Sequence, residues 1–146
     1  MSGIIGGAGS KSGVIGITEL DYEEGEWSPV ISNAGTLNAS SKGRYTKLGR
    51  QVTLTMWIGF AGTESGNCVL SGLPFTSMTD GDSAVLITAY NLEVTLAGEG
   101  YVSGYLSGGA SDIIITYFGR TNIPTDYLNY QDSGSRFFGS VTYFAT

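Results

Sequence analysis

Hydrophobic and polar residues alternate without a break along residues 51–60. Val52, Leu54, Met56, Ile58 and Phe60 fall on one face of an extended chain, and the residues between them fall on the other. Successive side chains of a strand point to opposite faces of its sheet. The pattern therefore predicts a strand with one face in a hydrophobic core.

Other runs of β-branched and aromatic residues, each bounded by turn-forming residues, predict further strands. They cover residues 28–32, 44–47, 67–71, 84–90, 112–118 and 136–144. Residues 91–96 and 101–106 alternate on either side of 97–100, which predicts a hairpin. Residues 122–130 contain Pro124 and are expected to form a loop. The prediction is an all-β protein, an antiparallel β-sandwich of about eight strands with a jelly-roll-like arrangement.

Length and composition fit one such domain. The chain has 146 residues, of which 23 are glycine and 3 are proline, and 14% are charged, against about 25% in a typical soluble domain. The glycine-rich start predicts an attachment arm over residues 1–20, followed by a β-sandwich domain over residues 21–146.

Charge and cysteine content exclude several classes of function. The net charge of −6 argues against nucleic-acid binding, which needs a surplus of Lys and Arg. Cys68 is the only cysteine, so no internal disulfide and no cysteine-based zinc site is expected. No apolar stretch approaches the length of a membrane span, and no signal peptide opens the chain. We expect synthesis in the cytoplasm, no membrane insertion and no cofactor.

The sequence Gly-Ile-Ile-Gly at residues 3–6 returns as Gly-Val-Ile-Gly at 13–16. Apolar pairs bracketed by glycines are too sparse to form a core, but they can fill apolar notches on a neighbouring molecule. A floppy leader is the alternative. We favour an arm that docks on another subunit through Ile4, Ile5, Val14 and Ile15.

The sequence offers little for catalysis, because it contains no histidine to act as a base near neutral pH. The candidate carboxylates all lie beside turns: Asp80, Asp82, Asp112, Asp126 and Asp132. Acids at turns usually accept hydrogen bonds from backbone amides. We predict no catalytic residue and no metal site.

Two segments of opposite charge lie close together in the sequence. Residues 19–26 hold five of the 13 acids, and residues 42–50 hold four of the seven bases. They form either solvated faces of one subunit or contacts that fix the register between subunits. In the second interpretation Glu23, Glu24, Arg44 and Lys47 lie at a subunit interface.

Tyrosines are frequent in the second half of the chain. Most are expected to pack in the core or at an interface, with the hydroxyl at the edge. Tyr127 and Tyr130 lie in the expected irregular loop, and loops of this kind often carry function. They are the candidates for contact with a receptor.

Four short motifs in order resemble a tail-fibre-type module of bacteriophages. They are Tyr-Glu-Glu-Gly-Glu-Trp-Ser-Pro at 22–29, Gly-Arg-Tyr-Thr-Lys-Leu-Gly at 43–49, Gly-Leu-Pro-Phe at 72–75 and Gly-Ser-Val-Thr-Tyr at 139–143. Such modules carry threonine where this chain has Glu26 and Ser28. Apart from the resemblance, Gly43 and Gly49 suggest turns at the two ends of a short strand. Trp27 is expected to be a large apolar anchor.

The resemblance implies a β-sandwich that often assembles as a homotrimer, and a location in the virion after synthesis in the host cytoplasm. The expected function is that of a non-enzymatic virion structural protein that binds other virion proteins through its arm and mediates adhesion to a glycan or protein of the host surface. One alternative is a capsid decoration protein, of cement or head-fibre type, that stabilises the head. A second is a glycan-degrading fibre tip.

Overall fold

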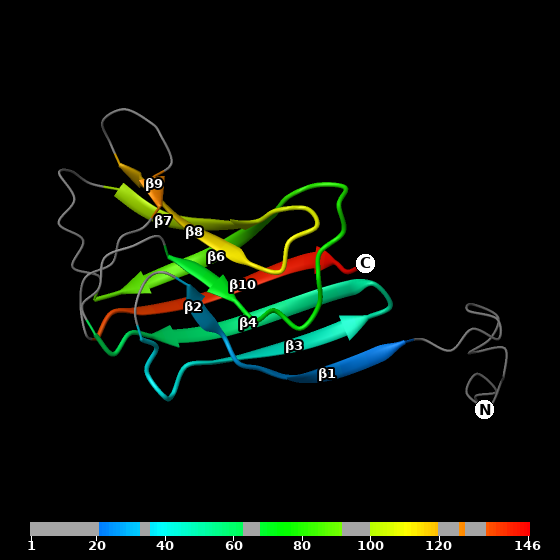
Figure 1. Ribbon diagram of the computed structural model, residues 1–146, viewed down its shortest axis with the longest axis horizontal. Coiled ribbons are helices and arrows are strands. Elements are labelled where there is room, and N and C mark those ends of the chain that lie inside the picture. Colours follow the sequence, from blue (N-terminus) through cyan, green and yellow to red (C-terminus); the bar gives the residue numbers. More distant parts are fainter. Residues whose placement is uncertain (1–20, 33–35, 63–67, 92–99, 120–125, 128–133) are drawn as a thin grey trace, which may run out of the picture.

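The computed structural model describes residues 21–32, 36–62, 68–91, 100–119, 126–127 and 134–146, and these form strands, turns and connecting segments with no helix (Figure 1). The strands are β1 (Tyr22–Trp27), β2 (Val30–Ser32), β3 (Lys42–Leu48), β4 (Gln51–Gly59), β5 (Val69–Ser71), β6 (Ser83–Tyr90), β7 (Gly100–Leu106), β8 (Ile113–Gly119), β9 (Asp126–Tyr127) and β10 (Arg136–Phe144).

The strands join in one antiparallel sheet of order β1-β3-β4-β10-β6-β7-β8-β5-β2, with β9 beside β8. Strands β1, β3, β4 and β10 run side by side (Figure 1). Only Ser28 and Pro29 separate β1 from β2, although these strands are the two ends of the order. The sheet must therefore curl until its two edges approach each other.

The prediction of an all-β antiparallel fold is confirmed. The described strands form a single hydrogen-bonded sheet, and both the sandwich of two layers and the jelly-roll arrangement stay predictions. The strand count rises above the expected eight because β1 and the two-residue strand β9 were not predicted.

The core lies inside the curl, on what we call the inner face of the sheet. The alternation at residues 51–60 is confirmed, since Val52, Leu54, Ile58 and Phe60 are at most 2% exposed. Phe60 meets Phe137 edge to face, with ring centroids 5.0 Å apart. The buried hydrophobic residues come from both halves of the curled sheet and form one cluster: Trp27, Val52, Leu54, Met56, Ile58, Phe60, Cys68, Leu70, Val85, Ile87, Leu106, Ile113, Ile115, Phe137, Val141, Tyr143 and Ala145.

Several strand boundaries were predicted closely. β10 has the expected bounds, and β4 ends one residue early because Phe60 forms an isolated bridge with Leu37. The predicted hairpin places one strand largely in residues 92–99, outside the described residues, while β7 pairs with β6 and β8. In the expected loop, Asp126 and Tyr127 form β9, which pairs with β8.

Strand β1 was not predicted, and the reason is physical. Its sequence is acidic and contains Gly25, both unfavourable in strands. It forms because it pairs with β3 along its whole length, from Tyr22 opposite Leu48 to Trp27 opposite Gly43. Acidic side chains at a sheet edge also discourage pairing with another chain. The predicted arm, including Ile4, Ile5, Val14 and Ile15, lies outside the described residues.

Candidate functional site

Two aromatic side chains on the inner face cover two glycines across the β1–β3 pair. Trp27 is opposite Gly43, and Gly25 is opposite Tyr45. A Cβ at residue 43 would overlap the Trp27 indole, and a Cβ at residue 25 would come within 2.8 Å of the Tyr45 hydroxyl. The glycines are therefore needed to admit the rings, a known way of stabilising glycine in strands. The indole N–H is buried without a hydrogen-bond partner among the described residues.

Tyr45 connects this pair to the other motifs. Its ring meets Phe75 edge to face, with centroids 5.3 Å apart. The carbonyl oxygen of Phe75 accepts a hydrogen bond of 2.8 Å from the hydroxyl of Tyr143 on β10. The four motifs noted in the sequence thus form one connected set of contacts. Their residues fix the strand register and the packing of the 72–75 turn.

This geometry corrects the prediction for Gly43. The residue lies inside β3 and not at a turn, and its role is to make room for Trp27. Gly49 does lie in the β3–β4 turn, with φ of 59°. Sequence reasoning missed the role of Gly43 because the partner that requires it lies on another strand.

Tyr143 is the buried tyrosine of this set. Burial raises the pKa of its hydroxyl from 10.0 to about 12, and the hydrogen bond to the Phe75 carbonyl opposes part of that rise. The neutral phenol is therefore the stable form at physiological pH, and it acts as a donor that secures the 72–75 turn.

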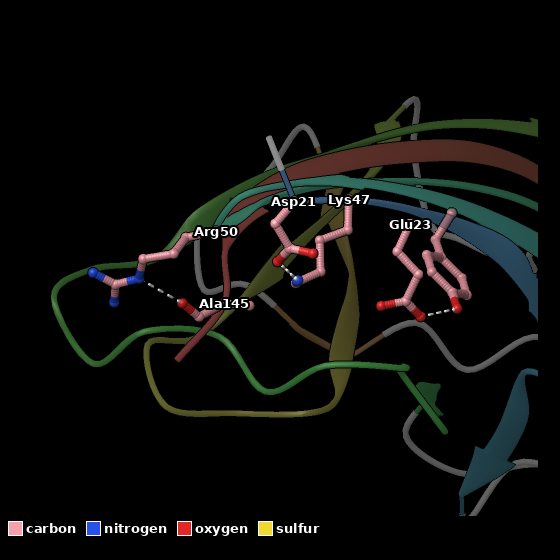
Figure 2. Close-up of polar contacts among 6 residues, drawn as sticks. Asp21, Glu23, Lys47, Arg50 and Ala145 are labelled. Carbon is pink, nitrogen blue, oxygen red and sulfur yellow. Dashed lines mark hydrogen bonds and ion pairs between the residues drawn. The ribbon is translucent and has the colours of Figure 1, made fainter. Parts of the chain in front are cut away.

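The charges of β1 and β3 divide between the two faces of the sheet. On the inner face Lys47 contacts Asp21 at 2.5 Å, and Tyr45 donates a 2.6 Å hydrogen bond to Glu23. Figure 2 shows the side chains of Asp21, Glu23 and Lys47 on the same side of the sheet. Arg50 lies nearby and donates a 3.1 Å hydrogen bond to the Ala145 carbonyl oxygen. The Lys47 amine also lies 5.6 Å from the centre of the Phe75 ring, and its side chain is only 17% exposed.

On the outer face, Arg44 lies 3.6 Å from Glu26, and both side chains are 68% exposed. Tyr22 donates a 2.6 Å hydrogen bond to Glu24, and this bond raises the pKa of the tyrosine. Pairs this exposed are weak, because solvent screens them. The acidic and basic segments thus meet within one chain. A role between subunits for Glu23, Glu24, Arg44 and Lys47 stays a prediction.

Of the turn acids, Asp82 behaves as the sequence suggested. Asp82 accepts a 3.0 Å hydrogen bond from the Gly108 amide, and Asp80 accepts a 3.3 Å bond from Thr79. Both line a depression of about 220 Å³ with Tyr143 and Phe144. Within the described ranges, no three His, Cys, Asp or Glu residues gather as metal ligands. Cys68 is fully buried, which raises the pKa of its thiol.

The receptor candidates are not brought together by a described surface. Tyr127 lies in β9, but its side chain falls outside the description, and so does Tyr130. Their contact with a receptor stays a prediction.

The outer face carries a feature that the sequence analysis missed. Of the exposed large hydrophobic residues in the described part of the chain, all but Val30 lie on this face: Tyr22, Leu48, Leu86, Tyr90, Tyr101, Phe138 and Phe144. The available signal was the run Ala-Val-Leu-Ile-Thr-Ala-Tyr at 84–90, which is apolar at both phases of the alternation. When a strand of this kind lies in a sheet with a single core, one of its two apolar faces is exposed to solvent.

Comparison with known proteins gives a likeness in structure. No protein-family model matches the chain, and no curated protein matches its sequence. Over 86% of its length the chain superposes on part of the Dettilon tailspike protein (gp208), with a TM-score of 0.68 and 17% sequence identity. The chain spans 24% of that protein. At this identity the likeness establishes a shared fold. Among the described residues, no helix has the length and apolar character to cross a membrane.

Proposed function

We propose that this chain is a non-enzymatic structural module of a bacteriophage virion, of the fibre or appendage type, displayed outward and used in adhesion to the host surface. The observation that carries the proposal is the fold shared with part of a tailspike protein over 86% of this chain. The four motifs add to it, because their residues contact one another: β1 pairs with β3, and the 72–75 turn packs on β3 and is hydrogen-bonded to β10.

The proposal includes attachment through residues 1–20, synthesis in the host cytoplasm, a homotrimeric state, and binding of a host glycan or protein. The non-enzymatic part of the proposal is supported by the sequence, which holds no histidine and one cysteine. The turn acids Asp80 and Asp82 accept hydrogen bonds from Thr79 and from the Gly108 amide.

Deleting the gene from the phage tests the proposal. Particles that remain intact but adsorb poorly to host cells are the expected result, and added purified protein should compete with wild-type particles for the host. Heads that burst more easily, with normal adsorption, would contradict the proposal and favour a decoration protein. New reducing ends after incubation with host polysaccharide would favour a glycan-degrading tip.

A further inference from the structure

A compact apolar cluster lies on the outer face at the centre of the sheet, on β4, β10 and β6. Trp57 is directly opposite Phe138, and Phe138 is opposite Thr88. Leu86 and Tyr90 therefore take the diagonal positions beside Phe138, within reach of its ring. We call Trp57, Leu86, Tyr90 and Phe138 the outer patch.

The outer patch is exposed to an unusual degree. Leu86 is 73%, Tyr90 61% and Phe138 40% exposed. Since an aromatic side chain presents on the order of 150–250 Å², covering the patch would remove roughly 300–400 Å² of apolar surface from water on each molecule. A stable interface takes about 800 Å² from each partner, of which about 60% is apolar. The patch can supply most of the apolar part of such an interface.

The charges around the outer patch are of both signs: basic residues lie beside it, and carboxylates lie at the sheet edge, where Arg44 is close to Glu26. Arg136 lies over the Trp57 ring at 5.7 Å, and Lys42 is the cross-strand neighbour of Trp57. Glu24 and Glu26 lie on the same face at the sheet edge, on β1. A surface with a basic flank and an acidic edge is complementary to another copy of itself, and copies joined by such contacts can close into a ring.

From the area of the patch and this charge arrangement we infer that the outer patch is the surface through which copies of this chain meet. The inference rests on the proposed function, since it names the contact surface of the proposed oligomer. A sugar ligand fits less well, because the most exposed residue of the patch is Leu86, which has no ring for stacking. An anionic partner would be repelled by the carboxylates of Glu24 and Glu26 on β1.

Sedimentation velocity and native mass spectrometry of the full chain, over a concentration series, test the inference. The wild type should form a closed oligomer. Leu86→Arg should raise the dissociation constant at least about tenfold, because each contact would bury an unpaired charge. Since Leu86 is mostly exposed, the variant should keep the wild-type circular dichroism spectrum. Leu86→Thr, which suits a strand, should weaken assembly in the same direction.

Val30→Arg is the matched control, because Val30 is 55% exposed but lies on edge strand β2, away from the patch. It should leave the dissociation constant unchanged. A wild type that stays monomeric overturns the inference. So does an oligomer that survives Leu86→Arg, even if the variant loses binding to host glycan. If the oligomer survives but the variant no longer binds host glycan, adsorption by the phage still depends on the protein, and the proposed function stands.

Discussion

At the scale of single residues, the inner face of the β1–β3 pair shows that an aromatic ring on one strand requires a glycine opposite it on the neighbouring strand. Trp27 and Tyr45 lie over Gly43 and Gly25, and each ring takes the space that a side chain would fill. The sequence already contained all four residues, but the spacing within each motif says nothing about which strand lies opposite. The pairing register of β1 and β3 shows which glycine lies opposite which ring.

Gly43→Ala should lower the free energy of unfolding by about 1–3 kcal/mol, because the added methyl group collides with a buried ring in a packed core. Thr46→Ala, on the exposed face of the same strand, is the control and should change stability by less than about 0.5 kcal/mol. Urea denaturation measures both. Equal stability of Gly43→Ala and wild type would show that Trp27 does not occupy the site.

Tyr143 should make stability depend on alkaline pH. Burial raises its pKa to about 12 in the folded protein, from 10.0, so folding favours the neutral phenol. The stabilisation is complete below pH 10 and is lost as pH rises from 10 toward 12. Thermal melts of wild type and Tyr143→Phe across this range should show a steeper decline for wild type. Parallel declines would mean that Tyr143 ionises as freely as an exposed tyrosine.

At the scale of elements, the strands that alternate apolar and polar residues were predicted well, because period-two patterns report one-sided burial directly. β4 and β10 are examples. β1 could not be predicted, since its six residues are mostly exposed and its stability comes from pairing with β3. The outer patch was missed for a related reason. A strand that is apolar on both faces leaves apolar residues on its second face, but its sequence does not identify what would cover them.

Truncations test the boundary between arm and domain. Removal of residues 1–20 should leave the circular dichroism spectrum and the melting temperature close to wild type, since β1 begins at Tyr22. Removal of residues 1–27 should cost at least about 3 kcal/mol, because Trp27 is lost from the core. If the shorter deletion already unfolds the protein, the first twenty residues are part of the folded domain.

At the scale of the whole molecule, one curled sheet buries the apolar residues of its inner face and leaves other apolar residues on its outer face. The inner core includes Cys68, which is 0% exposed and whose thiol pKa is raised by burial. The thiolate that reacts with labelling reagents is therefore disfavoured in the folded state. An outer face of this character is expected of a protein that works in an assembly.

Thiol labelling should follow global unfolding. Iodoacetamide should leave Cys68 unmodified in native buffer and modify it fully in urea, as measured by the mass of the intact protein. Rapid labelling of the native protein would contradict the closed core described for the curled sheet.

The central claim is the proposed place of the protein in a phage particle, and immunogold electron microscopy of purified virions tests it most directly. An antibody raised against residues 21–146 should label the tail or its appendages on intact particles, and particles lacking the gene should not be labelled. Label confined to the head surface, or no label on any particle, would contradict the account.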